Sequence, residues 1–91
     1  MWFVYVLLCE GNSLYCGATN DLKKRFSDHK NGKGGRYTRS HKPLKLIYQE
    51  TFNTQSEALK RERQIKGWTR DEKIRILNLL YMIKPLDNFK P

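Results

Sequence analysis

The strongest constraint on the fold comes from two apolar segments that a very short link joins. Residues 2–8 are apolar on both alternating faces, which is typical of a central strand covered on both sides. Residues 10–13 have turn-forming chemistry, and residues 14–18 return as a second strand. Two strands joined by so short a link must be antiparallel, so the chain begins with a hairpin.

Helix caps, glycines and a proline place the remaining elements. Thr19 or Asn20 caps a first helix, and two capping boxes, at residues 54–57 and 69–72, begin two more. The predicted segments are a helix to about residue 31, a strand over 44–52, a helix ending at residue 67 and a helix to about residue 82. The expected order is ββαβαα. This is an α/β (α+β) fold in which helices pack on a three-stranded antiparallel sheet.

Length and charge limit the functional classes. Ninety-one residues make one domain, expected over residues 1–83, with a loose tail at 84–91. Eighteen Lys and Arg against nine Asp and Glu give a net charge of +9, which favours a polyanionic partner and most commonly nucleic acid. The longest apolar run, residues 2–9, is too short to span a bilayer, so no membrane role is expected.

The two cysteines have neither metal-ligand spacing nor the density of a disulfide scaffold. Cys9 and Cys16 both lie in apolar strand context, so we expect free buried thiols. No basic segment precedes the first apolar run, so that run is not a signal peptide. We therefore expect a cytoplasmic protein.

Two tyrosines, one arginine and one isolated carboxylate on a basic chain form a set suited to cutting a phosphodiester. Tyr5 and Tyr15 lie in the two hairpin strands, Arg25 lies one turn into the first helix, and Glu62 lies in the next long helix. Together with His29, these residues and their spacings resemble the GIY-YIG nuclease superfamily, specifically its small single-domain bacterial branch of uncharacterised UPF0213-like proteins. The resemblance covers roughly residues 2–80.

The two signature triads are close to the family pattern without repeating it. The first is Phe3-Val4-Tyr5, in which Phe3 replaces glycine, and the second is Tyr15-Cys16-Gly17, in which Cys16 replaces isoleucine. Both tyrosines and the structural Gly17 are kept. The resemblance implies that Tyr5 lies near the attacking water as the general base, and that Tyr15 orients the phosphate or the first tyrosine. Each could instead be an ordinary strand tyrosine.

Glu62 falls on the apolar side of its helix, between Ala58 and Leu59 on the helical wheel. A carboxylate there costs free energy unless it is paired or binds a metal. One reading is an ion pair with Arg25 or a nearby lysine. The resemblance implies instead that Glu62 holds a divalent cation, usually Mg²⁺, which keeps several water ligands and so suits a lone carboxylate.

The first helix carries two further candidates. Leu22, Phe26 and His29 form its inward stripe, and Arg25 lies at the edge of that stripe. Arg25 could simply cover the core with its stem, whereas the resemblance assigns it to the scissile phosphate. His29 is an alternative general base because its pKa suits neutral pH, or it is a core histidine.

Two other regions complete the candidates. The segment between the first helix and the third strand suits a phosphate track with a base-stacking contact, although it could be a solvated loop. Its candidate nucleic-acid contacts are Lys30, Lys33, Arg36, Tyr37, Arg39 and Lys42. Asn78, a polar residue in an apolar run, matches a family asparagine that ties the last helix to the site.

The hairpin register decides whether the two tyrosines can act together. In a symmetric hairpin Tyr5 and Tyr15 fall on opposite faces of the sheet. A register shifted by one, with Tyr5 opposite Gly17, places both on one face and needs a three-residue connection or a bulge around Gly11. We predict the shifted register.

The sequence thus predicts a divalent-metal-dependent endonuclease that hydrolyses phosphodiester bonds, with nucleic acid, expected to be DNA, as its partner. No second targeting domain is recognisable, so sequence specificity is expected to be poor or to be supplied by a partner protein. The alternatives are a nucleic-acid-binding module of the same fold without turnover, and a protein-interaction domain that retains only the fold.

Overall fold

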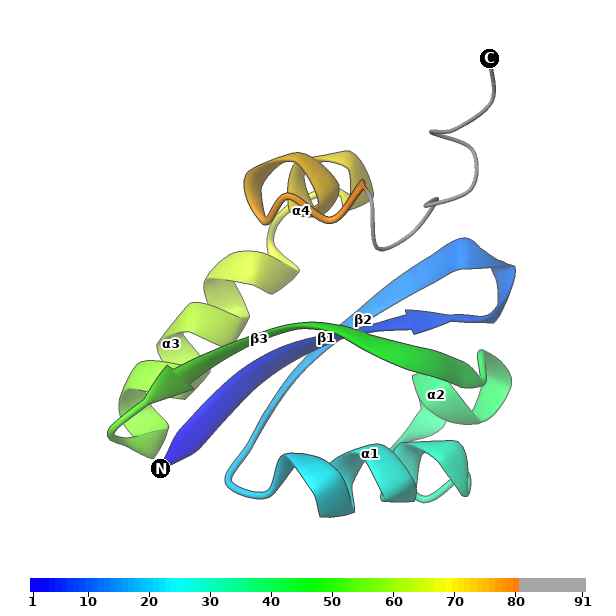
Figure 1. Cartoon of the computed structure of the whole chain (residues 1–91), viewed down its shortest axis with the longest axis horizontal. Coiled ribbons are helices and arrows are strands. Elements are labelled where there is room, and N and C mark those ends of the chain that lie inside the picture. Colours follow the sequence, from blue (N-terminus) through cyan, green and yellow to red (C-terminus); the bar gives the residue numbers. More distant parts are fainter. Residues whose placement is uncertain (81–91) are drawn as a thin grey trace.

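The computed structural model describes residues 1–80, and its centre is a three-stranded antiparallel sheet. Strand β1 (Trp2–Cys9) lies between β2 (Ser13–Thr19) and β3 (Pro43–Phe52), so the first strand is the central one (Figure 1). This confirms the predicted sheet and the antiparallel hairpin. Only β1 has both neighbours, which is why its side chains are apolar on both faces.

The register of the hairpin is the shifted one. Tyr5 pairs with Gly17 and Leu7 pairs with Tyr15. The link is a three-residue 3₁₀ turn, Glu10–Asn12, in which Gly11 has φ 76° and Asn12 has φ 63°. Glycine and asparagine adopt this left-handed backbone conformation most readily, so the turn residues permit the odd-numbered connection. The predicted register is confirmed, and both tyrosines share one face of the sheet.

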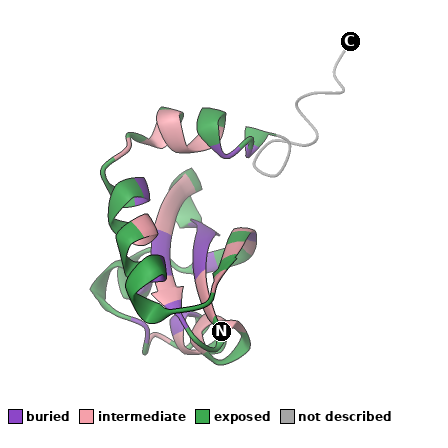
Figure 2. Cartoon of the chain, turned by 90° about the vertical axis from the view of Figure 1, so that its left-hand side faces the viewer, coloured by how far each residue is buried: buried purple, intermediate pink, exposed green. Residues whose placement is uncertain are grey.

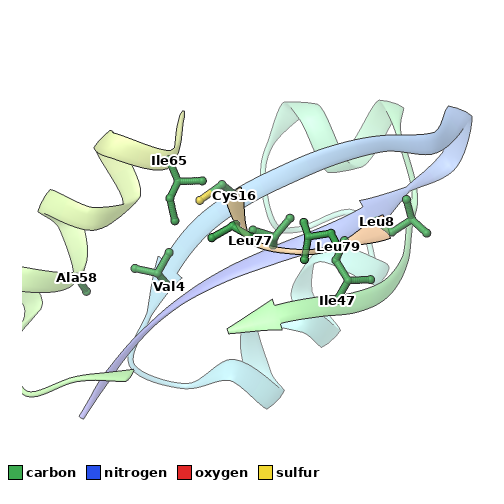
Figure 3. Packing of buried hydrophobic residues seen from close by; sticks show 9 residues of the cluster. Val4, Leu8, Cys16, Ile47, Ala58, Ile65, Leu77 and Leu79 are labelled. Atoms are coloured by element: carbon green, nitrogen blue, oxygen red, sulfur yellow. The ribbon is translucent and has the colours of Figure 1, made fainter. Parts of the chain in front are cut away.

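Helices cover both faces of the sheet (Figures 1 and 2). On one face, Leu22 and Phe26 of α1 (Leu22–Lys30) pack against a buried cluster of Tyr5, Leu7 and Cys9. The other face packs against α3 (Gln55–Lys66) and the residues that follow α4 (Arg70–Ile76). Figure 3 shows that core, whose buried members include Val4, Leu8, Cys16, Ile47, Ala58, Ile65, Leu77 and Leu79.

The start of one helix differs from the prediction, whereas another helix has the predicted bounds. Asp21, rather than Thr19 or Asn20, caps α1, because its side chain accepts a hydrogen bond from the Lys24 backbone N–H. Helix α3 begins and ends where its capping box and Gly67 predicted. Of its predicted apolar arc, Ala58 and Ile65 are buried, whereas Leu59 is exposed.

The structure adds one helix that the sequence did not predict. Helix α2 (Arg36–Ser40) lies in the segment expected to be an irregular loop, so the element order is ββααβαα. Gly35 caps it with φ 129°, a conformation that glycine adopts without strain. At five residues α2 is too short for a periodic signal, and this explains why the pattern of glycines and charges concealed it.

The last predicted helix was wrong at its C-terminal end. Helix α4 stops at Ile76 instead of continuing to residue 82, because Asn78 adopts φ 57°. The backbone N–H of Leu79 donates to the Ile74 carbonyl at 2.8 Å, and that of Asn78 donates to Arg75 at 3.3 Å. These bonds form a Schellman motif, which returns Leu79 to the core.

Three further expectations concern the C-terminal tail, membrane-spanning segments and the cysteines. The expected tail at residues 84–91 lies outside the described residues. None of the helices within residues 1–80 has the length and apolar character needed to span a bilayer. Cys9 and Cys16 are buried and free, as predicted.

Candidate active site

Tyr5 lies at the centre of the candidate site. It is 2% exposed, and its ring centroid lies 6.4 Å from that of Tyr15 on the neighbouring strand. The Tyr5 ring also covers Gly17, where a Cβ atom would come within 2.6 Å of the ring carbon Cζ. Glycine is therefore required opposite Tyr5, and this is the physical reason for the last residue of the second triad.

His29 joins Tyr5 to a residue that the sequence did not nominate. His29 is fully buried in the last turn of α1, and its Nε2 lies 2.8 Å from the Tyr5 hydroxyl. Its Nδ1 lies 2.7 Å from Oγ1 of Thr38, a buried residue of α2. The result is a chain of two buried hydrogen bonds, Tyr5–His29–Thr38.

Gly34 packs directly on the His29 ring. A Cβ at position 34 would come within 2.6 Å of the imidazole Cγ, so only glycine fits there. The two alternatives predicted for His29 are therefore compatible, because the residue is buried in the core and also bonded to the candidate base Tyr5. Thr38 and Gly34 were missed because each acts through His29, and only the positions of the glycines around residue 35 hinted at a constrained backbone.

Burial sets the protonation of the chain. Removal from water raises the pKa of Tyr5 to about 12, although the nearby Arg25 opposes the shift. Burial also lowers the pKa of His29, and the positive charge of Arg25 lowers it further. At neutral pH the pair is thus a neutral phenol and a neutral imidazole, which is able to take up a proton.

Arg25 lies beside the Tyr5 hydroxyl. It is half-buried, its Nη2 donates to the Gly34 carbonyl at 3.3 Å, and its interaction with the Tyr5 hydroxyl raises the pKa of the guanidinium. Arg25 also lines a recess of about 280 Å³, whose other lining residues are Thr19, Asn20, Asp21, Lys24 and Asp28. Arg25 is therefore a cation held beside the Tyr5 hydroxyl.

Glu62 reaches the same region from the other side of the sheet. Its side chain is 19% exposed, and Oε2 lies 3.2 Å from Nζ of Lys66 one turn later on α3. The Lys66 Nζ also lies 5.8 Å from the centroid of the Tyr15 ring. The negative charge of Glu62 contributes to the raised pKa of Tyr5. The lysine that the sequence allowed as a partner of Glu62 is therefore Lys66, which connects the carboxylate to Tyr15.

An aromatic stack leads from the site to the surface. Tyr15 stacks on Tyr37 of α2 with centroids 5.8 Å apart, and Tyr37 stacks on His41 at 4.5 Å. Tyr37 is 38% exposed and His41 is exposed. The predicted base-stacking residue thus adjoins the tyrosine pair, and His41 extends its surface.

The predicted basic contacts lie close to Tyr37 and His41 in the sequence. They are exposed, and within residues 1–80 none of them forms an ion pair; they are Lys30, Lys33, Arg36, Arg39 and Lys42. Asn78 is exposed, and within the same residues its side chain makes no hydrogen bond to the site. Its backbone ends α4, so its place in the structure is that of a helix stop.

A second recess of the surface lies elsewhere. About 490 Å³ in volume, it is lined by Phe52, Glu57, Lys60, Arg61 and Gln64. None of these is a candidate site residue. Chemistry rather than size therefore locates the site, since Tyr15, His29 and Arg25 gather around Tyr5.

The chain is similar in sequence to known proteins. The family model described as the GIY-YIG catalytic domain matches residues 1–75. The chain belongs to the GIY-YIG family. A UPF0213 protein of Staphylococcus epidermidis is 48% identical over 75 residues, which cover 82% of this chain and 92% of that protein. A UPF0213 protein of Staphylococcus saprophyticus is 43% identical over 76 residues, covering 84% and 93%.

A solved structure shares the fold of this GIY-YIG domain. The solution NMR structure of a UPF0213 protein from Bacillus halodurans superposes with a TM-score of 0.56 at 34% identity, covering 88% of this chain and 86% of that one. The domain is thus a UPF0213-type member of the family, as its triads predicted. The family description makes nuclease chemistry on nucleic acid the function to test.

Proposed function

We propose that this GIY-YIG domain is a divalent-metal-dependent endonuclease that hydrolyses phosphodiester bonds in DNA. The observation that carries the proposal is the buried hydrogen bond of 2.8 Å between the Tyr5 hydroxyl and His29 Nε2, with Arg25 beside it. A buried phenol with a pKa near 12 needs a proton acceptor before it can act as a base, and neutral His29 is that acceptor.

The proposed reaction uses Tyr5 and His29 as one unit. The oxygen of an attacking water forms a bond to phosphorus while the bond from phosphorus to the leaving oxygen breaks. The proton of that water passes to the Tyr5 oxygen as the phenol proton moves to His29 Nε2. The leaving oxygen takes a proton from solvent, and the His29 proton returns to solvent, so the reaction ends as simple hydrolysis.

Arg25 has a complementary role. Its guanidinium is planar and always charged, so it can donate two hydrogen bonds to a phosphate and stabilise the charge that develops during attack. Its bond to the Gly34 carbonyl helps to hold it beside the Tyr5 hydroxyl. Lysine would offer one point charge there instead of a fork of donors.

Glu62 is the residue proposed to hold the divalent cation. Within residues 1–80 no three His, Cys, Asp or Glu side chains gather as a metal cluster, so the donor set is one partly buried carboxylate. Such a set fits Mg²⁺, which keeps several waters and takes phosphate oxygens as further ligands. When bound, the ion would supply positive charge beside the phosphate. In the free protein Glu62 is paired with Lys66 of the same helix, which would compete with the cation.

The stack of Tyr15, Tyr37 and His41 supports contact with nucleobases, and the exposed lysines and arginines around it support contact with phosphates. A partner protein is proposed to supply sequence or structure specificity. The proposed setting is the cytoplasm, where the buried Cys9 and Cys16 thiols stay reduced.

A panel of linear and branched DNA tests the proposal. The wild type should cleave at least one member with Mg²⁺ and none with EDTA, whereas Glu62→Ala should bind the same DNA without cleaving it. Binding without cleavage by the wild type would favour the alternative, a nucleic-acid-binding module without turnover. A wild type that neither binds nor cleaves any DNA would reject both.

A further inference from the structure

The neutral imidazole of His29 has two possible tautomers, and the hydrogen bonds at its two nitrogens distinguish them. Nε2 meets the Tyr5 hydroxyl at 2.8 Å and Nδ1 meets Thr38 Oγ1 at 2.7 Å. A hydroxyl can donate or accept, so both tautomers satisfy the distances. The choice depends on what else surrounds each hydroxyl.

The Tyr5 hydroxyl has a second neighbour, Arg25, which interacts with its oxygen. A guanidinium carries only donors, so Arg25 cannot accept the phenol proton. Tyr5 is 2% exposed, so in the free protein its hydroxyl is largely shielded from bulk water. The acceptor available to the phenol proton within residues 1–80 is therefore Nε2 of His29. If Nε2 accepts, Nδ1 must carry the hydrogen and donate it to Thr38.

We infer that Thr38 is a positioning residue that holds His29 in the Nδ1–H tautomer, so that Nε2 is free to accept the proton of Tyr5. Thr38 does this from α2, whose N-terminal glycines bring it against His29. Gly34 packs against the imidazole ring, and its carbonyl oxygen accepts a hydrogen bond from Arg25. The segment that follows α1 therefore fixes the base, its tautomer and the arginine together.

The inference rests on the proposed function only in giving the tautomer a use, since the tautomer itself is a property of the free protein. Without the Nδ1 partner, His29 would populate the Nε2–H form, which cannot take a proton at Nε2. Loss of this positioning contact should lower the cleavage rate by about 100-fold.

Imidazole ¹⁵N NMR of the uniformly labelled chain tests the inference directly. In the wild type, His29 should show a protonated Nδ1 and a bare Nε2, with exposed His41 as the internal reference. An Nε2–H signal for His29 in the wild type would overturn the inference, and this reading needs no variant.

Two variants and a control extend the test. Thr38→Val keeps the shape of the side chain and removes the acceptor, so the His29 signals should move toward the Nε2–H form, whereas Thr38→Ser should retain the wild-type pattern. Thr51→Val, at an exposed strand position, should change nothing. A folded Thr38→Val protein with an unchanged tautomer would overturn the inference. A confirmed tautomer in a protein that cleaves no DNA would instead count against the proposed function.

Discussion

The Tyr5 ring lies directly over Gly17 of the adjacent strand, and no other residue type fits beneath it. This pairing follows from the shifted register of the hairpin, which places Tyr5 opposite Gly17 and Tyr15 opposite Leu7. A Cβ at position 17 would meet the phenol at Cζ within 2.6 Å. The position of the candidate base Tyr5 therefore depends on the absence of a Cβ atom at Gly17.

Gly17→Ala should displace the Tyr5 ring and disturb its bond to His29. Overpacking of a buried site typically costs about 1–3 kcal/mol, so the free energy of unfolding should fall by that amount, and cleavage should fall with it. Urea denaturation measures the first effect. Gly67→Ala is the matched control, because its Cβ would meet no atom closer than 3.4 Å and its φ is −76°. Equal stability of the two variants would contradict this account.

Tyr5→Phe should remove the proton donor of the chain while keeping the ring. The loss leaves His29 Nε2 buried without a partner, which costs about 1–3 kcal/mol of stability. Loss of a general base should lower the cleavage rate by about 10²–10⁴-fold. Tyr48→Phe serves as the control. The Tyr48 hydroxyl donates to Glu50, which also accepts from Arg61, and none of these three is a candidate site residue. A cleavage rate unchanged in Tyr5→Phe would exclude the proposed relay.

His29 should make stability depend on pH. Its folded pKa lies below the ordinary value of 6.5, so the unfolded chain binds more protons in the window between the two values. Stability should be at its full value above about pH 6.5 and should fall as the pH drops through the folded pKa, by at most about 1.4 kcal/mol per pH unit. The measurement is urea denaturation from pH 7.5 to 5.

His29→Gln removes the titrating group, so its stability should depend less on pH than that of the wild type across this window. His41→Gln, at an exposed position, should follow the wild type. Parallel curves for the wild type and His29→Gln would show that His29 titrates normally in the folded protein.

The sequence predicted the sheet, the register and the meeting of the tyrosines because these follow from strand alternation and turn length. It could not predict Thr38, because the bond to His29 joins two helices through a turn whose path depends on Gly34 and Gly35. It likewise read residues 70–82 as one helix, because a Schellman stop at Asn78 leaves the apolar spacing of the neighbouring leucines intact.

Lys66→Met should strengthen binding of a divalent cation. The Lys66 Nζ forms an ion pair with Glu62 Oε2 at 3.2 Å, and a cation at Glu62 must displace it. A partly exposed ion pair is worth up to about 1 kcal/mol, so removing the lysine should tighten Mn²⁺ binding by up to about fivefold. Electron paramagnetic resonance titration of free Mn²⁺ at low salt measures this. Lys60→Met removes the same charge from an exposed position on the same helix and is the control. Equal affinities in the two variants would show that Lys66 and the cation do not share Glu62.

The most direct test of the central claim compares cleavage and binding of one DNA by Glu62→Gln. The single-turnover rate with Mg²⁺ should fall by at least about 10²-fold relative to the wild type, because the neutral amide cannot hold the cation. The Kd for the same DNA, measured without metal, should change by less than about threefold, since one partly buried charge adds little to phosphate contact. Asp71→Asn, an exposed helix residue, should match the wild type in both. A Glu62→Gln protein that cleaves at the wild-type rate would contradict the account.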